Sequence, residues 1–139
     1  MNEKEIITKS SMLLMKIKGY PPAKYYEYIC RFFDSTRYDM DLHIEIISSS
    51  QYRLFAYERG ALVYEYRTKK VDEIIFSIVD TVIGIMVQDE TDRLCADENG
   101  ALYYTDEVRN YSKALEDLYF SMIGGIYNEM HKQGKRAML

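Results

Sequence analysis

Hydrophobic and polar residues alternate along the centre of the chain, from Leu42 to Arg67. An alternation with period two places successive side chains on opposite faces of a strand, and the many aromatic and β-branched residues suit a pleated surface. Two short polar interruptions divide this stretch, Ser49-Ser50 and Arg59-Gly60. Each fits a two-residue hairpin turn, and Gly60 adopts a positive φ without steric cost. The pattern therefore predicts a three-stranded antiparallel meander.

The two turns also predict a register, and with it an apolar face. A loop at Arg59-Gly60 pairs Phe55 with Tyr64, and a loop at Ser49-Ser50 sets Ile44 opposite Phe55. The expected core face, with Arg53 as its one charged exception, carries Leu42, Ile44, Ile46, Phe55, Tyr57, Leu62, Tyr64 and Tyr66. The expected opposite face is mixed and carries His43, Glu45, Ile47, Tyr52, Leu54, Ala56, Glu58, Val63, Glu65 and Arg67. A slip of one residue would exchange the two faces.

A long apolar helix is predicted directly after the meander, over residues 70–92. Its apolar residues recur at helical spacing from Ile74 to Val87 and leave few polar positions. Asp72 and Glu73 suit the positive end of the helix dipole, and Thr68 is a candidate N-cap. A helix that is apolar nearly all round is buried on several sides. We therefore expect this helix to be the hub that packs on the sheet.

Helices are also predicted on both sides of this centre. Residues 3–18 form an amphipathic pattern that Gly19 and Pro21-Pro22 end. Residues 23–33 fit a second, shorter helix, although their aromatic content leaves a strand or a loop open. Residues 106–133 keep near-helical spacing, but Gly124-Gly125 should weaken or break that helix. The expected fold class is α+β, with an N-terminal helix or helices, the meander, and two longer helices packed on one face of the sheet.

Length and composition fit one soluble domain. The chain has 139 residues, 47% of them apolar, which is enough to build a core. The expected single domain spans residues 1–139 and divides into an N-terminal helical region, the meander, the hub helix and a C-terminal helical region, at residues 1–41, 42–68, 70–92 and 106–133. The chain has an unusual aromatic composition, with 14 tyrosines, five phenylalanines and no tryptophan. Tyrosine is enriched at interfaces, but half-buried tyrosines on a small sheet explain the same count.

Charge and targeting signals narrow the class of protein further. A net charge of −4 argues against general nucleic-acid binding and favours a basic protein partner. The N-terminus lacks the apolar segment of a signal peptide, and the apolar window from Ile74 to Val87 is too short to cross a membrane. Cys30 and Cys95 lie far apart and are expected to be reduced thiols. These features predict a cytoplasmic protein without membrane contact.

No motif in the sequence predicts chemistry. The chain has no glycine-rich phosphate loop, no cysteine pair at metal-ligand spacing and no His-Glu motif. Its two histidines are His43, expected at the surface of a strand, and His131 near the C-terminus. Adjacent carboxylates such as Asp72-Glu73 suit helix ends better than a general acid–base pair. We therefore predict no catalytic, cofactor-binding or metal-binding residues.

The central stretch resembles the immunity protein 63 family of bacterial polymorphic-toxin systems. The residues that carry this resemblance are Leu42-His43-Ile44-Glu45-Ile46, Tyr52-Arg53-Leu54-Phe55 with Tyr57-Glu58-Arg59-Gly60, Tyr64 to Thr68 with Val71 to Phe76, and Asp106 to Leu118. They are similar to that family's PHIEV-type strand, its second strand with an ERG turn, its third strand with a DELLYW-type helix start, and its C-terminal helix. The last helix of the family usually has a proline-containing break, where this chain has Gly124-Gly125.

The resemblance implies a protein that neutralises a cognate toxin by tight stoichiometric binding in the cell that makes both. It supplies no catalytic residues. The expected partner-binding surface is the mixed sheet face with the neighbouring turn, and its residues are Glu45, Tyr52, Leu54, Glu58, Arg59, Glu65 and Arg67. Two alternatives remain open: a regulatory or adaptor domain that binds another protein, and a small enzyme or ligand-binding protein with a deep apolar pocket.

Overall fold

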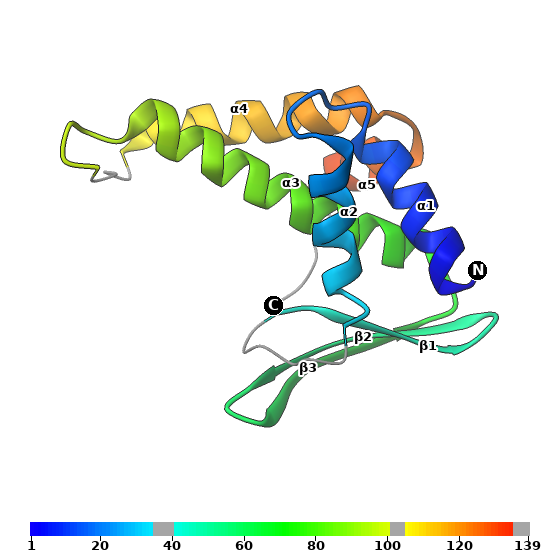
Figure 1. The fold of residues 1–139 in the computed structure, drawn as a ribbon. Coiled ribbons are helices and arrows are strands. Elements are labelled where there is room, and N and C mark those ends of the chain that lie inside the picture. Colours follow the sequence, from blue (N-terminus) through cyan, green and yellow to red (C-terminus); the bar gives the residue numbers. More distant parts are fainter. Residues whose placement is uncertain (35–40, 101–104, 135–139) are drawn as a thin grey trace.

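Helices and a three-stranded sheet form two layers in the computed structural model, which describes residues 1–34, 41–100 and 105–134. The elements in chain order are α1 (Glu3–Leu14), α2 (Pro22–Arg31), β1 (His43–Ser48), β2 (Gln51–Glu58), β3 (Ala61–Thr68), α3 (Val71–Cys95), α4 (Asp106–Ile123) and α5 (Gly125–Lys132). The labelled helices all lie on one side of the sheet (Figure 1). The expected α+β fold is thus confirmed.

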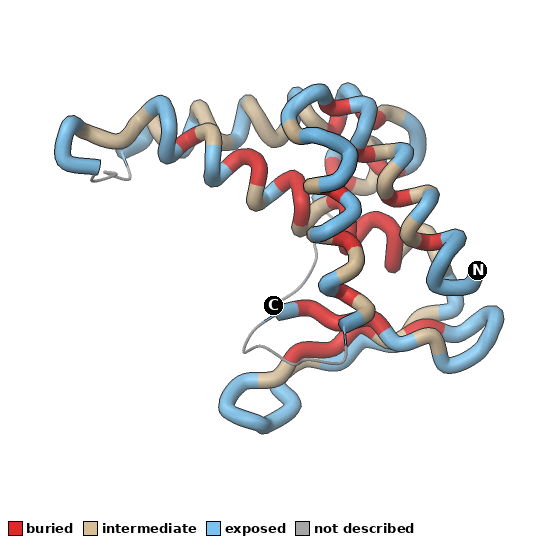
Figure 2. The backbone as a smooth tube through the Cα atoms, in the orientation of Figure 1, coloured by how far each residue is buried: buried red, intermediate tan, exposed pale blue. Residues whose placement is uncertain are grey.

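Helix α3 is the centre of the helical layer. Ile74, Ile75 and Ile78 are completely buried, and α3 contacts α1, α2, α4, α5 and strand β2. Buried positions concentrate along α3 and on the sheet beneath it (Figure 2). Burial of so much apolar surface is the main source of folding free energy, so the core is built around this helix.

The start of α3 differs from the prediction in one detail. Its N-cap residue is Lys70, whose side chain makes no capping hydrogen bond, and not Thr68. The Thr68 hydroxyl instead accepts a hydrogen bond from the Lys70 backbone N–H at 3.0 Å and donates one to Glu73 Oε1 at 2.6 Å. Thr68 therefore joins the end of β3 to the first turn of α3.

The last helical stretch is broken where the sequence predicts. Helix α4 begins after Thr105, whose hydroxyl accepts the Val108 N–H at 3.2 Å, and it ends at Ile123. Gly124 then adopts a φ of +68° and a ψ of −165°, which a residue with a side chain rarely adopts. The chain turns there into α5. Helices α3 and α4 run side by side and extend beyond the sheet as an arm (Figure 1).

The N-terminal segment forms two helices. Asn2 and Glu5 form a capping box at the start of α1, and α1 ends at Leu14, four residues earlier than predicted. The following turn is fixed by the Tyr25 hydroxyl, which donates to the Ile17 carbonyl at 2.6 Å. Residues 22–31 form a helix, so the aromatic segment that could also have been a strand or a loop is helical. Residues 35–40, between this helix and β1, lie outside the described residues.

Both predicted turns of the meander are present. Arg59 and Gly60 have φ values of 51° and 79°, as a two-residue hairpin turn requires, and Tyr57 lies opposite Leu62. The strand order is β1-β2-β3, and each neighbouring pair is antiparallel. The sheet topology is therefore the one that the sequence predicts.

The register away from the turns differs from the prediction, because each outer strand contains a β-bulge. One extra residue, Ile47 in β1 and Val63 in β3, shifts the pairing by one position. Phe55 consequently lies opposite Glu65 and not Tyr64, and it pairs with His43 on its other side. The expected pairing of Phe55 with Ile44 is wrong for the same reason.

Because of the two bulges, the face of β2 that meets the helices is the opposite of the predicted one. Tyr52, Leu54 and Ala56 face the helices and are buried, whereas Arg53 and Phe55 lie on the opposite face. The predicted core face was therefore right for Leu42, Ile44, Ile46, Tyr64 and Tyr66 and wrong for Phe55, Tyr57 and Leu62. The predicted register would have buried the Arg53 guanidinium beneath the helices, which costs several kcal/mol, on the order of the penalty for desolvating one ion.

Candidate functional site

The face of the sheet that points away from the helices is the candidate functional site, and we call it the outer face. No helix or strand from the described parts of the chain packs on it (Figure 1). Its side chains come from all three strands. They are His43 and Glu45 from β1, Arg53, Phe55 and Tyr57 from β2, and Leu62, Glu65 and Arg67 from β3.

An aromatic cluster forms the centre of the outer face. The Phe55 ring stacks on His43 with centroids 5.5 Å apart and meets the edge of Tyr57 at 5.9 Å. The Arg53 guanidinium lies over the same ring, 4.2 Å from its centroid. Phe55 is 6% exposed, although none of the described helices packs on this face. A guanidinium over an aromatic ring is held by a cation–π attraction as well as by its ion pair.

A charged network borders this cluster. Arg53 Nε donates to Glu65 Oε2 at 2.8 Å, and Arg67 Nε donates to Glu65 Oε1 at 3.1 Å. These two hydrogen bonds, the one from Arg53 first, hold the pKa of Glu65 below its ordinary value. Partial burial alone would lower the pKa of Arg53, but its bonding to Glu65 holds that pKa above the ordinary value. These shifts favour the charged forms of Arg53 and Glu65.

The environment of His43 differs from the prediction of a surface residue. His43 is 3% exposed, and neither ring nitrogen has a hydrogen-bond partner among the described residues. The His43 ring stacks on the Phe55 ring, so its neighbour on the outer face is an apolar side chain. This arrangement offers no carboxylate to orient the imidazole for acid–base catalysis, which such a role normally uses.

The seven residues predicted to bind a partner fall into three places. Glu45, Glu65 and Arg67 lie on the outer face. Glu58 and Arg59 lie at the β2–β3 turn. Tyr52 and Leu54 are each 2% exposed and face the helices.

Tyr52 and Leu54 therefore belong to the core. The Tyr52 hydroxyl accepts a hydrogen bond from the Met1 amine at 2.6 Å, which ties the N-terminal segment to the first hairpin. The sequence missed Arg53, Phe55 and Tyr57 as outer-face residues. The signal that identifies them is Arg53 itself, since a charged residue on a predicted core face argues for the other register.

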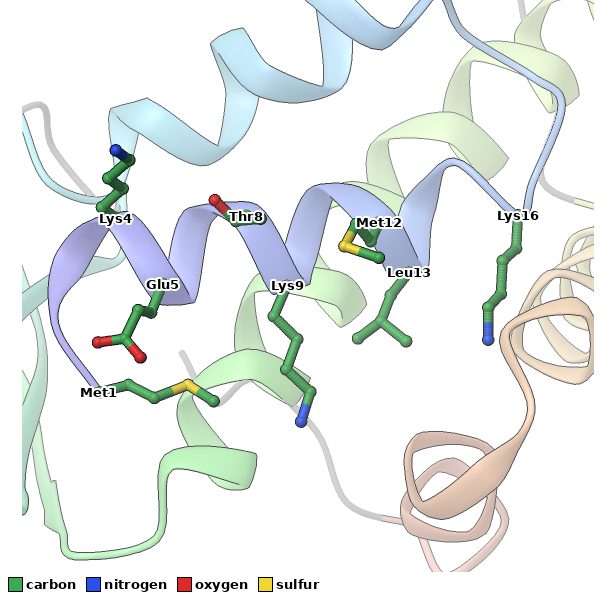
Figure 3. A pocket seen from close by; sticks show the side chains of 8 residues that line it. All are labelled: Met1, Lys4, Glu5, Thr8, Lys9, Met12, Leu13 and Lys16. Atoms are coloured by element: carbon green, nitrogen blue, oxygen red, sulfur yellow. The ribbon is translucent and has the colours of Figure 1, made fainter.

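Apart from the outer face, a hollow runs along α1. It has a volume of about 630 Å³ and is lined by Met1, Lys4, Glu5, Thr8, Lys9, Met12, Leu13 and Lys16. Figure 3 shows Glu5, Lys9 and Lys16 on one side of α1 and Lys4 on the other. This hollow was not predicted from the sequence, although the spacing of Glu5 and Lys9 by four residues places them on one side of a helix.

Two of the three lysines that line this hollow contact other parts of the protein. Lys16 Nζ donates to the Ile123 carbonyl at 3.2 Å, and Lys9 Nζ lies 6.0 Å from the centre of the Tyr127 ring. These contacts link α1 and the turn after it to the C-terminal helices. The hollow thus contains contacts between helices, and it presents no arrangement of a nucleophile with a base.

His131 forms a further cluster of titratable groups, with two carboxylates of α4. Its Nε2 lies 2.7 Å from Asp117 Oδ1 and its Nδ1 lies 3.6 Å from Glu116 Oε1. The ring stacks on Phe120, with centroids 4.1 Å apart, and is buried. These contacts join α5 to α4 across the glycine break. Among the described residues, no group of three or more histidine, cysteine, aspartate or glutamate side chains could hold a metal ion.

The comparisons with known proteins add no family. Neither a family model, nor a curated protein, nor a solved structure matches this chain. Membership of the immunity protein 63 family stays a prediction. Within the described parts of the chain, no helix combines the length and the apolar character that a membrane crossing requires.

Proposed function

We propose that this protein is an immunity protein that neutralises a cognate bacterial toxin by tight one-to-one binding through the outer face. The observation that carries the proposal is the outer face itself, which none of the described helices covers and on which Glu45, Leu62 and Arg67 are exposed beside the half-buried Tyr57. The resemblance of residues 42–118 to a family of immunity proteins gives the class of partner. Binding to a toxin requires no catalytic group on this chain.

The outer face has the composition that tight protein interfaces use. Such interfaces have an apolar and aromatic centre with arginine, surrounded by a polar rim. Here Tyr57 and Leu62 lie together at one end of the sheet, and Leu62 is 46% exposed. Glu45, Glu65 and Arg67 supply charged positions along the same face. An aromatic anchor with a charged rim supports stoichiometric binding.

Charge favours a basic partner surface. The chain carries a net charge of −4, and Glu45 and Glu58 lie on or beside the outer face, outside the hydrogen-bonded network of Arg53, Glu65 and Arg67. Opposite charges steer association and accelerate it at low salt. A toxin with a basic active site, such as one that cleaves a nucleic acid, would therefore associate rapidly, and the association rate constant would fall as salt rises.

The test is binding and rescue with the product of the gene directly upstream. We expect the tagged protein to capture that product, isothermal titration calorimetry to give one-to-one binding at nanomolar Kd or tighter, and co-expression to rescue cells from its toxicity. The absence of both binding and rescue would refute the proposal. Capture of a partner that is not toxic would instead support the adaptor alternative.

Matched variants locate the site. Leu62→Ala removes an exposed leucine from the outer face, and Leu118→Ala removes one of nearly equal exposure, 48%, from α4. We expect Leu62→Ala to raise Kd at least tenfold and Leu118→Ala to leave it unchanged. Glu45→Lys and Glu129→Lys form a second pair, in which only the first should slow association. If both members of each pair bind like the wild type, the outer face is not the site.

A further inference from the structure

The outer edge of β3 is an unpaired strand edge in the described part of the chain. Strand β1, the other edge, is partly covered, because the Ile44 N–H donates to the Phe32 carbonyl at 2.8 Å. No such backbone bond is present on the outer side of β3 among the described residues, and β3 packs mainly on β2. Its residues are exposed or only half-buried throughout. An exposed edge of this kind is a template for a further strand.

The regular part of β3 is self-complementary in sequence. The bulge at Val63 leaves Tyr64 to Thr68 as an unbroken stretch of five residues, and Tyr66 is its centre. An antiparallel strand of the same sequence, related by a two-fold axis at Tyr66, would place Glu65 opposite Arg67 twice. Opposite charges directly across an antiparallel ladder are stabilising, and like charges are destabilising.

From this edge we infer that the protein forms a two-fold symmetric dimer in which the β3 strands of two copies pair and create one six-stranded sheet. The interface is isologous, since each copy contributes the same residues. Glu65 of one copy bonds Arg67 of the other on the outer face. The two Tyr66 side chains, each 40% exposed in the single chain, meet on the helical side of the sheet.

The charges of the single chain are compatible with this pairing. Arg67 is 64% exposed in its side chain and bonds Glu65 through one oxygen, Oε1, while Arg53 holds Oε2. Arg67 can therefore change its partner from its own Glu65 to that of the second copy without separating Glu65 from Arg53. Because the bulge limits pairing to five residues, we expect a Kd in the micromolar range rather than a permanent dimer.

Charge reversal with mixing tests the inference on the chain alone, independently of any toxin. Sedimentation equilibrium of the wild type should show a concentration-dependent rise from 16.4 kDa towards twice that mass. Glu65→Arg and Arg67→Glu should each be monomeric, because each places like charges opposite one another twice. An equimolar mixture of the two variants should dimerise, since every opposed pair then has opposite signs.

A wild type that stays monomeric up to high micromolar concentration overturns the inference, as does a mixture that stays monomeric while the wild type dimerises. Circular dichroism confirms that each variant is folded. A failure of toxin binding would leave this result unchanged, and a monomeric wild type that binds its toxin would refute the dimer alone.

Cysteine crosslinking tests the register. In a Cys30→Ser/Cys95→Ser background, Tyr66→Cys places two thiols across the two-fold axis, and mild oxidation should yield a covalent dimer. Leu62→Cys, exposed on the same strand, is the matched control, because in this register each Leu62 lies opposite Lys70 of the other copy. Equal crosslinking of both variants would overturn the proposed register.

Discussion

The guanidinium of Arg53 on β2 meets the carboxylate of Glu65 on β3 across the outer face of the sheet, with Nε and Oε2 2.8 Å apart. The two residues are not directly opposite, since Arg53 pairs with Arg67 and Glu65 with Phe55. Their contact is diagonal, and it exists only because β2 presents Arg53 away from the helices. The same carboxylate also holds Arg67 from its own strand, so Glu65 forms ion pairs with two arginines.

This network predicts a pH dependence of stability. The pKa of Glu65 lies below its ordinary value of 4.5, so the folded chain holds this proton less tightly than the unfolded chain. Its contribution to stability is therefore complete above that ordinary value and is lost as pH falls through the lower folded pKa. We expect the free energy of unfolding of the wild type to fall more steeply below pH 4.5 than that of Glu65→Gln.

Urea denaturation at a series of acidic pH values measures this difference. Glu107→Gln, an exposed carboxylate in the first turn of α4, is the control and should retain the wild-type slope. Equal slopes for the wild type and Glu65→Gln would contradict the prediction. Added salt should reduce the difference, because exposed charges are screened.

Two glycines should respond to alanine with opposite signs. Gly124 has a φ of +68° between α4 and α5, so Gly124→Ala should lower the free energy of unfolding by about 1–3 kcal/mol. Gly84 lies exposed within α3, and a Cβ there would meet nothing within 4 Å. Gly84→Ala should raise stability by about 0.5–1 kcal/mol. Thermal and urea denaturation measure both, and a destabilised Gly84→Ala would contradict the prediction.

A buried hydrogen bond should make Tyr127 important for stability. Tyr127 is 4% exposed, and its hydroxyl donates to Asp72 Oδ1 at 3.0 Å. Burial, and then this bond to a carboxylate, raise the pKa of Tyr127 above its ordinary value. We expect Tyr127→Phe to cost about 1.5 kcal/mol, typical for loss of a hydrogen bond to a charged group. Tyr111→Phe, half-exposed on α4, is the control for urea denaturation and should match the wild type.

The aromatic stack between α3, α4 and α5 should be the most sensitive part of the helical layer. Phe120 is completely buried, stacks on His131 at 4.1 Å and lies 5.7 Å from the Phe76 ring. Phe120→Ala should lower the free energy of unfolding by about 4 kcal/mol, because it leaves a cavity. Leu118→Ala, two residues away and half-exposed, should change it by less than about 0.5 kcal/mol. Similar losses for both variants would contradict the prediction.

Much of the fold could be predicted from local patterns. The turn at Arg59-Gly60, the apolar run of α3 and the glycine break after Ile123 are each set by residues close together in the sequence. A positive φ at Gly60 or Gly124 is a property of the residue, and it needs no partner. Such features do not depend on the rest of the fold, so the order of elements could be predicted from the sequence.

The candidate site was harder to predict from the sequence than the fold was. Of its predicted residues, Glu45, Glu65 and Arg67 do lie on the outer face, but Tyr52 and Leu54 lie on the opposite one. The error comes from the bulges, whose single extra residue leaves no clear mark in a sequence and reverses the face of a whole strand.

The sequence by itself therefore determined the longer helices, the turns and the strand order, because these depend on backbone preferences and on hydrophobic periodicity, whereas it left residues 23–33 open. Only the tertiary structure decided which face of β2 meets α3. Strand β2 has two possible registers. In one, Arg53 is buried beneath the helices. In the other, Arg53 reaches Glu65 while Leu54 fills the core. The desolvation cost of a buried guanidinium exceeds the small local cost of two bulges, so packing and not local preference fixed the outer face.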